Sequence, residues 1–432
     1  MSKDINCTNY KNCPKNFSET NLLNYYTDET GKLSFDFLFV GCWGVYCSGK
    51  ETKVHSYKKD KNSFEEDKKT KYGQKEVVAS MVKFSENNKQ DAVILAGDNV
   101  YNDNDPTEEV KKAVIEAGKK LNDNENDNEK IPEIIDFFLK KINEFKKDDT
   151  DVLKKDALSY LEKIKSEQSD INKKIKKVFK EVKSKLLDMP KQLDKGFENC
   201  MGNVNTDNFF IGVGNHDIEN CDVINEQLNY KNPKWKMPAL SYNVLVKMDG
   251  FNVNLIFIDT NMYDDTWCQG NYPPDAKATQ ATWFESVLSE SENTWNIVIG
   301  HVPFACNPHK KLKGGGIRTT PGLLELIQKN TSKIDLYMCA DEHCQHYVNY
   351  KKEEISFPPE VIAGSGGTKL EDQILEILPK EQVLLSRISF GYVSVKVSAE
   401  ELDLTFHSVQ VYEKSDGDKT FTINKTDRNE RI

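Results

Sequence analysis

Residues that could bind metals or transfer protons follow five apolar runs of this sequence. The first two runs are followed by GCWG (residues 41–44) and GDNVY (97–101). The later three are followed by GNHD (214–217), GHVP (300–303) and ADEH (340–343). Cations that activate water bind carboxylate, imidazole and amide-oxygen ligands, and a pair of cations needs one carboxylate that can bridge them. Together the five segments supply this set.

Within these segments, Asp98 could bridge two ions and Asn215 could provide an amide oxygen. Tyr101 lies close enough to Asp98 in sequence to share an ion. A single aspartate after a strand more often caps a turn, and a lone histidine is more often structural. The five segments recur in order, each after a strand, and this joint pattern predicts a metal site. The remaining candidate donors are His301, Asp341 and His343.

The apolar runs that precede these segments predict buried strands. Near-continuous runs rich in β-branched and aromatic residues are typical of strands covered on both faces. Helix-period segments at 75–87 and 281–291 would cover the resulting sheet. We therefore predict a layered α/β fold with its polar loops at the carboxyl ends of the strands, where ligands collect in open sheets. The predicted strands lie within 35–40, 91–99, 209–217, 253–260, 295–301 and 334–340.

The segment from 105 to 205 has a different character, because Lys, Asp and Glu dominate it. Ile134, Phe138, Ile142 and Phe145 recur at helical spacing and would share one face. We predict an inserted helical hairpin that interrupts a main domain at 34–425, flanked by tails at 1–33 and 426–432. Its charged residues form either solvated outer faces or a docking surface for a protein partner.

Composition limits the function classes. The chain has 432 residues, 38% of them hydrophobic, and a formal net charge of -10. Such an acidic chain lacks the basic face that nucleic-acid binders use, so we expect no nucleic-acid partner. No run reaches the roughly 20 apolar residues that span a bilayer, and residues 1–17 lack the apolar stretch of a secretory signal. Ten cysteines at irregular spacing and four glycosylation sequons leave the compartment open.

The five segments resemble the blocks of the metallophosphoesterase superfamily, and in detail those of the purple, tartrate-resistant acid phosphatases. GDNVY is similar to that family's GDNxY block, GNHD to GNHD, and GHVP to GHxP. Further similar stretches are WKMPALSY (235–242), IDT (258–260), GSGG (364–367) and FGY (390–392). The resemblance implies a four-layer αββα sandwich, and a secreted or lysosomal type of protein.

The resemblance also implies roles for the site residues. Asp98 would bridge two metal ions, with iron in one position and iron, zinc or manganese in the other. His216 would contact phosphate or protonate the leaving oxygen, and Asp217 would orient His216. His309 either supplies a second leaving-group histidine or is a surface residue. Tyr101 and His343 would bind the first ion, and Asn215, His301 and Asp341 the second.

Two positions depart from the family pattern. Cys42 stands where the family's GDWG block has an aspartate, and Asp341 stands where its GHxH block has a histidine. A carboxylate at Asp341 still suits zinc, iron or manganese. Cys42 could bind metal as a thiolate, lie buried as an inert thiol, or form a disulfide with Cys47 or Cys339.

Three functions are consistent with this pattern. The first is metal-dependent hydrolysis of a small phosphate monoester through a dinuclear centre with altered ligands. The second is a catalytically weak or inactive scaffold that keeps the phosphatase fold for binding. The third uses the same site on phosphodiesters or on protein phosphates, because loop shape sets substrate choice.

Overall fold

A computed structural model defines most of the residues that flank the predicted insertion. The chain divides into two compact units, Met1–Val100 with Gly196–Ile432, and Tyr101–Lys195. Residues 102–192 lie outside the described part, so the predicted helical hairpin and its partner surface stay predictions. The described residues are 22–26, 32–44, 54–58, 63–67, 73–101, 193–218, 221–263, 272, 274–289, 291–305, 320–352, 354–368, 370, 379–409, 417–425 and 427.

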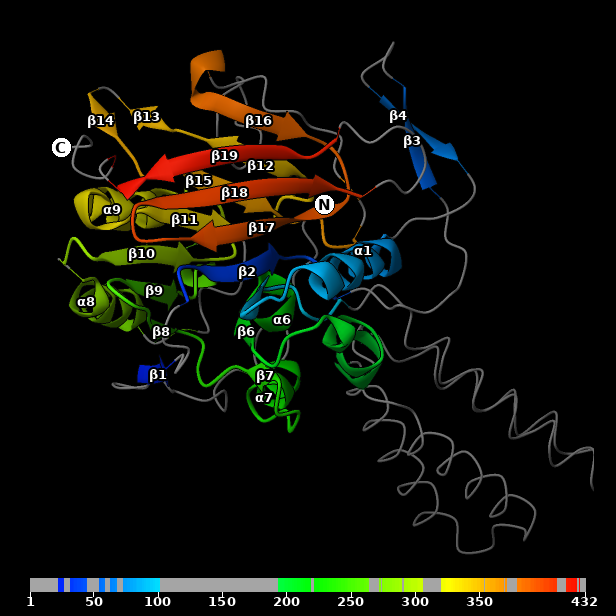
Figure 1. The fold of residues 1–432 in the computed structure, drawn as a ribbon, viewed down its shortest axis with the longest axis horizontal. Coiled ribbons are helices and arrows are strands. Elements are labelled where there is room, and N and C mark those ends of the chain that lie inside the picture. The colour runs from blue at the N-terminus through cyan, green and yellow to red at the C-terminus, as the bar shows by residue number, and fades with distance from the viewer. Residues whose placement is uncertain are drawn as a thin grey trace, which may run out of the picture. The chain divides into compact units, whose positions relative to one another are not determined.

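The first large sheet has seven strands in the order β19-β18-β17-β2-β5-β6-β7 (Figure 1). Its strands β2, β5, β6 and β7 run parallel, and β17, β18 and β19 continue it in antiparallel fashion. The bounds are β2 (Phe35–Val40), β5 (Ala92–Ala96), β6 (Phe209–Gly212), β7 (Trp235–Lys236), β17 (Gly391–Val397), β18 (Glu401–Ser408) and β19 (Lys419–Asn424).

The second large sheet has eight strands in the order β1-β8-β9-β10-β11-β15-β12-β16. Strands β9, β10, β11 and β15 are parallel neighbours. The bounds are β1 (Leu22–Tyr26), β8 (Tyr242–Lys247), β9 (Asn252–Phe257), β10 (Thr294–Ile299), β11 (Leu336–Cys339), β12 (Gln345–Val348), β15 (Glu360–Ala363) and β16 (Val383–Arg387). Two hairpins pair β3 (Val54–Lys58) with β4 (Ser63–Asp67), and β13 (Lys351–Lys352) with β14 (Ile355–Ser356).

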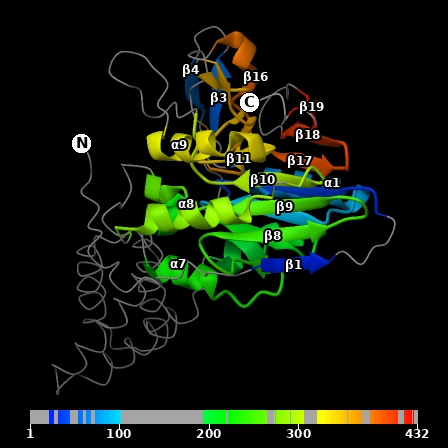
Figure 2. The same cartoon turned by 90° about the vertical axis from the view of Figure 1, so that its left-hand side faces the viewer.

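The longer helices cover the outer faces of the two sheets (Figures 1 and 2). The longer ones are α1 (Gln74–Asn87), α8 (Ala276–Val287) and α9 (Pro321–Lys329). Shorter ones are α6 (Asn215–Ile218), α7 (Cys221–Leu228), a π-helical turn at Asp194–Glu198, and 3-10 turns at Met201–Asn203, Asn261–Tyr263, Thr331–Lys333 and Lys380–Gln382.

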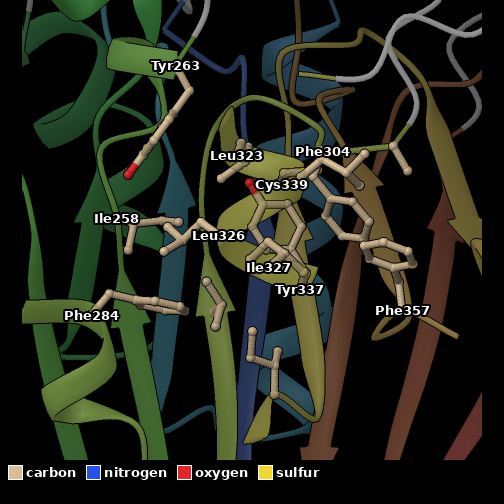
Figure 3. Packing of buried hydrophobic residues seen from close by; sticks show 14 of the residues in the cluster. Ile258, Tyr263, Phe284, Phe304, Leu323, Leu326, Ile327, Tyr337, Cys339 and Phe357 are labelled. Atoms are coloured by element: carbon tan, nitrogen blue, oxygen red, sulfur yellow. The ribbon is translucent and has the colours of Figure 1, made fainter. Parts of the chain in front are cut away.

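The packing gives the four layers in the predicted order. Phe284 of α8 and Leu323 of α9 lie in one buried cluster with Ile258 and Tyr337, which covers the outer face of the eight-stranded sheet (Figure 3). On the inner side, the rings of Phe210 in β6 and Phe257 in β9 lie 6.5 Å apart. On the far side, Phe84 of α1 contacts Tyr392 and His407 of the seven-stranded sheet. The predicted αββα sandwich is confirmed.

The parallel strands bring their carboxyl ends to shared sheet edges. In the seven-stranded sheet, β2, β5 and β6 are adjacent, so the segments that follow Val40, Ala96 and Gly212 begin side by side. In the other sheet, β10 and β11 are adjacent, so the segments after Ile299 and Cys339 also meet. This topology gathers the five polar segments at two sheet edges, three at one and two at the other. Among the described residues, no helix combines the length and apolar character needed to cross a membrane.

Candidate metal centre

Asp98 follows β5 on a backbone that turns sharply. Its φ is 53°, in the left-handed region that aspartate tolerates better than most residues, and the preceding Gly97 has a φ of 87°. A side chain at position 214 would place its Cβ only 2.2 Å from Oδ1 of Asp98, so a glycine is required there. Only 1% of Asp98 is exposed. The local backbone therefore fixes a buried carboxylate at the strand end.

One group of donors joins Asp98 with Cys42 and His343. Donor atoms of Cys42, Asp98 and His343 all lie within 4.8 Å of one another. Sγ of Cys42 is 3.8 Å from Oδ2 of Asp98. Cys42 follows β2 and His343 follows β11, so this group joins loops from both sheets.

A second group of donors lies on the Oδ1 side of Asp98. Nε2 of His301 is 3.0 Å from Oδ1 of Asn215, 3.3 Å from Oδ1 of Asp98 and 3.7 Å from Oδ1 of Asp341. Asn215, Asp98 and His301 are buried, and the Asp341 side chain is 17% exposed. The two groups share one residue, Asp98, which offers one carboxylate oxygen to each.

Neighbouring groups fix the orientation of the His301 ring. Nδ1 lies 2.7 Å from the carbonyl oxygen of Ala96, which can only accept, so Nδ1 carries a proton. The backbone N–H groups of His301 and Val302 both donate to Oγ1 of Thr260, at 3.1 and 2.9 Å. In the neutral ring, Nε2 therefore keeps its lone pair and faces Asp98 and Asn215.

The charges at this site favour a cation. Burial alone would lower the pKa of His301, but the carboxylates of Asp98 and Asp341 and the Ala96 carbonyl outweigh burial and raise this pKa to about 9. Without a metal, a proton on His301 thus supplies the positive charge that the buried carboxylates attract. A divalent cation held by the same oxygens would supply that charge instead. Carboxylate, imidazole, amide and thiol donors suit iron, zinc or manganese, so the residues present fit such ions.

Asp217 differs from the sequence-based expectation that it orients His216. Its Oδ1 accepts hydrogen bonds from the backbone N–H groups of Asn99 and Val100 and from Nε2 of Gln227. Its Oδ2 accepts from the Gly214 N–H at 2.8 Å and from the Asn99 side chain at 3.1 Å. These bonds hold the loop after Asp98 against the loop that begins at Gly214. Burial, with the nearby Asp98 charge adding to it, raises the pKa of Asp217 to about 7.

The other predicted site residues are placed as follows. His216 is partly exposed, and its backbone N–H donates to Oδ1 of Asp98 at 3.1 Å. Tyr101 is buried but is the first residue of the second compact unit, so its role as a ligand stays a prediction. His309 lies outside the described residues. Cys42 and Cys339 are not joined by a disulfide, so that predicted alternative is wrong, and Cys47 lies outside the described residues.

Comparisons with known proteins indicate a phosphoesterase family. The family described as Calcineurin-like phosphoesterase matches residues 180–345. Purple acid phosphatase 4 of Arabidopsis thaliana is 25% identical over 215 residues, which cover 46% of this chain and 59% of that protein. Purple acid phosphatase 3 of the same plant is 27% identical over 168 residues, which cover 36% of this chain and 44% of that protein.

The chain is similar to the metallophosphoesterase superfamily. The alignments span about half of the length of these curated relatives. Among solved structures, the chain is similar in fold to GAP50, described as the anchor in the inner membrane complex of Plasmodium. The TM-score is 0.51 at 14% identity, and the match covers 93% of this chain and 94% of that one.

Several residues that support the candidate metal centre were not identified from the sequence. Asn99 accepts a hydrogen bond from the Trp43 indole at 2.9 Å and donates to Oε1 of Gln227 at 3.0 Å. Thr260 positions His301 as described above. Asn99 and Thr260 lie within motif-like stretches, but Gln227 lies on α7, where no motif marks it. Only the three-dimensional arrangement identifies Gln227.

Proposed function

We propose that this chain hydrolyses small phosphate monoesters with a pair of metal ions that share Asp98. The observation that carries this proposal is the placement of Asp98 between two donor groups. Oδ2 of Asp98 lies near Cys42, which is grouped with His343, and Oδ1 lies near His301, which contacts Asn215. A carboxylate that offers one oxygen to each of two ions is the central ligand that a two-metal phosphoesterase needs. Similarity to this family supports the reaction class.

Each ligand group would hold one ion. Cys42 and His343 would complete the first position, and Asn215, His301 and Asp341 the second. When bound, such ions polarise the phosphoryl oxygens and lower the pKa of water, which makes water a nucleophile at neutral pH. The carboxylates of Asp98 and Asp341 would hold the ions, and the Ala96 carbonyl keeps Nε2 of His301 directed toward Asp98.

His216 is suited to act on the substrate itself. Its backbone N–H is tied to Asp98, which fixes the residue beside the shared carboxylate, while the residue stays partly exposed. A partly exposed imidazole next to the ions can donate a hydrogen bond to a phosphate oxygen or a proton to the leaving oxygen. We therefore assign His216 as the general acid or phosphate ligand of the reaction.

The identity of the ions is a finer part of the proposal. The purple acid phosphatase relatives, together with Tyr101, favour iron in one position and iron, zinc or manganese in the other. Two features of this chain alter that balance, since Cys42 adds a soft ligand and Asp341 adds a negative charge. The centre would thus keep two positions but with an ion preference of its own.

The direct test is elemental analysis of the purified chain together with an aryl phosphate assay from acid to neutral pH. The proposal predicts close to two metal ions per chain and hydrolysis that stops when a chelator removes them. A protein that holds no metal and cleaves no aryl phosphate at any of these pH values rules it out.

The altered positions support a second candidate function, a scaffold that keeps the fold without catalysis. Both Cys42 and Asp341 lie at the candidate metal centre, so the two changes affect the same site. A scaffold has no need for convergent buried donors, which weighs in favour of the enzyme. Metal analysis separates the two, since the scaffold predicts a chain purified without ions even after incubation with zinc or manganese.

We also propose that the protein works in an oxidising compartment, in keeping with the secreted or lysosomal type implied by its relatives. Cys200 is disulfide-bonded, and such cross-links persist mainly in secretory or extracellular environments. Thiol labelling of the protein from its native cell tests this. A fully reduced Cys200 would contradict the proposal.

A further inference from the structure

The first donor group differs from the second because it contains a sulfur atom. We propose that Cys42 binds metal as a thiolate and makes this position selective for a soft or borderline divalent ion such as zinc, while the position of Asn215, His301 and Asp341 takes a harder ion such as manganese. This inference rests on the metal centre of the proposed function and specifies its ion selectivity.

The spacing of the donors fits a single ion between them. With a metal–sulfur distance of about 2.3 Å and a metal–oxygen distance of about 2.1 Å, two ligands at a tetrahedral angle lie roughly 3.6 Å apart. Sγ of Cys42 and Oδ2 of Asp98 are 3.8 Å apart, and His343 completes a group within 4.8 Å. The three side chains therefore need little movement to bind one zinc ion.

The backbone of Cys42 is held in a conformation that directs its side chain. Its φ is 53°, a left-handed value that costs a cysteine more than it costs asparagine, aspartate or glycine. The Cys42 N–H donates to the Gly97 carbonyl at 3.1 Å, and the Cys42 carbonyl accepts from the Thr368 N–H at 3.2 Å. Surrounding structure thus maintains the strained conformation, as is typical of functional positions.

A neighbouring glycine leaves room for the sulfur. A Cβ at position 364 would lie 3.2 Å from Sγ of Cys42 and 2.2 Å from the Glu342 carbonyl oxygen. Any side chain at Gly364 would therefore collide with the backbone and crowd the thiol. The space beside Sγ is kept by a backbone constraint and does not depend on flexible side chains.

The other described free thiols show what a cysteine outside the metal centre contacts. Sγ of Cys339 donates to the backbone carbonyl of Val361 at 3.5 Å, and Sγ of Cys344 lies 2.9 Å from Nε2 of His346. Among the described residues, Cys42 is the cysteine that shares a group with both a carboxylate and a second metal-binding side chain. This placement distinguishes Cys42 from an inert core thiol.

The charges at this position favour a bound cation. A thiolate beside the buried Asp98 carboxylate would place two like charges in a medium of low dielectric constant, and a divalent cation between them would offset their repulsion. When a divalent ion binds, the thiol proton passes to solvent and the thiolate becomes a ligand. Thiolates favour zinc over harder ions, whereas carboxylate and amide oxygens suit manganese, so the two positions differ in preference.

X-ray absorption spectroscopy of the zinc-loaded full chain tests this without any substitution. We expect a sulfur ligand at about 2.3 Å beside the shorter nitrogen and oxygen ligands. A zinc shell of nitrogen and oxygen alone overturns the inference. If no zinc binds, the inference also fails.

Variants then assign the sulfur. Loading with cobalt should give a near-ultraviolet thiolate-to-cobalt absorption band in the unaltered chain and in the control Cys339→Ser, but not in Cys42→Ser or Cys42→Asp. Because aspartate tolerates the left-handed backbone, Cys42→Asp should fold. We expect Cys42→Asp to lower the affinity for zinc relative to manganese by at least about tenfold. Mutation of residues that only hydrogen-bond to metal ligands already lowers metal affinity by about that factor.

The outcomes separate this inference from the proposed function. A band that persists in Cys42→Ser, or an unchanged preference in Cys42→Asp, overturns thiolate binding even if aryl phosphate is still hydrolysed with two ions bound. Conversely, a sulfur-bound zinc in a chain that hydrolyses no phosphate ester supports thiolate binding and rejects the enzyme.

Discussion

Nε2 of His301 lies 3.3 Å from Oδ1 of Asp98, and both side chains are buried. His301 follows β10 of one sheet and Asp98 follows β5 of the other, so this contact joins the two halves of the sandwich at the candidate metal centre. The Ala96 carbonyl directs the ring from behind. The proposed metal centre depends on this contact between the two loops.

Asp98→Asn should remove most of the metal and the activity. The amide keeps the shape of the side chain and one acceptor oxygen for the His216 N–H, but it loses the negative charge that both ions would share. We expect the rate of hydrolysis to fall by more than about 100-fold. This exceeds the loss of activity that is usual when a residue that only hydrogen-bonds to a metal ligand is mutated. Elemental analysis and an aryl phosphate assay measure both effects, and circular dichroism confirms folding. A variant with two bound ions would contradict the bridging role.

His216→Ala should separate chemistry from metal binding. The backbone N–H that bonds to Asp98 remains, so the ions should stay bound. Loss of a general acid or phosphate ligand should lower kcat by about 100- to 10,000-fold. The measurement is steady-state kinetics with metal content determined on the same sample. Unchanged kcat would show that His216 does not act on the substrate.

Asp217→Ala should weaken the fold as well as the site. The change removes a fully buried acceptor of five hydrogen bonds and leaves the donors of Asn99, Val100, Gly214 and Gln227 without it. We expect the free energy of unfolding to fall by about 3 kcal/mol or more. Urea unfolding measures this.

A matched control for Asp217 is Asp249→Ala, because Asp249 is exposed. The control should change the free energy of unfolding by less than about 0.5 kcal/mol. Equal stability of the two variants would contradict the supporting role assigned to Asp217.

His346 should make the fold sensitive to acid. Burial lowers the pKa of this fully buried histidine from 6.5 to about 3, so the folded state holds it neutral. Between pH 6.5 and 3 the unfolded chain binds the extra proton. The contribution of His346 to stability is therefore complete above pH 6.5 and declines as the pH falls, by up to about 1.4 kcal/mol per pH unit.

Comparison with His346→Leu isolates this contribution from that of the carboxylates. Urea unfolding at pH 7.5, 5.5 and 4.5 should show the unaltered chain losing stability faster than the variant as the pH falls. Parallel pH profiles for the two proteins would contradict the neutral buried state of His346.

The sequence predicted the strands of the sheets well where burial on both faces dictates composition. The run at 35–40 coincides with β2, and the run at 295–301 contains most of β10, because these strands are fully covered. The helix predicted at 281–291 instead spans Ala276–Val287. Its first turn, AKATQ, has no apolar period, and Asp275 makes no capping hydrogen bond, so neither usual signal marks the start.

The site was predictable in part for a similar physical reason. Residues that follow parallel strands converge, so Asp98, Asn215 and His301 could be placed together from their positions in the sequence. The partners of Asp217 could not, because Gln227 reaches it from a helix that carries no motif. Spacing along the chain does not determine the direction of a thiol, so the sequence could not exclude a disulfide between Cys42 and Cys339, which the structure does not contain.

If two cations share Asp98, anomalous X-ray scattering from crystals grown with zinc and manganese will show both of them at this residue. We expect two anomalous peaks about 3.5–4 Å apart, with Asp98 between them, one peak beside Cys42 and His343 and the other beside His301 and Asn215. A single peak remote from Asp98, or the absence of any peak at these residues, would contradict the binding of two cations at Asp98.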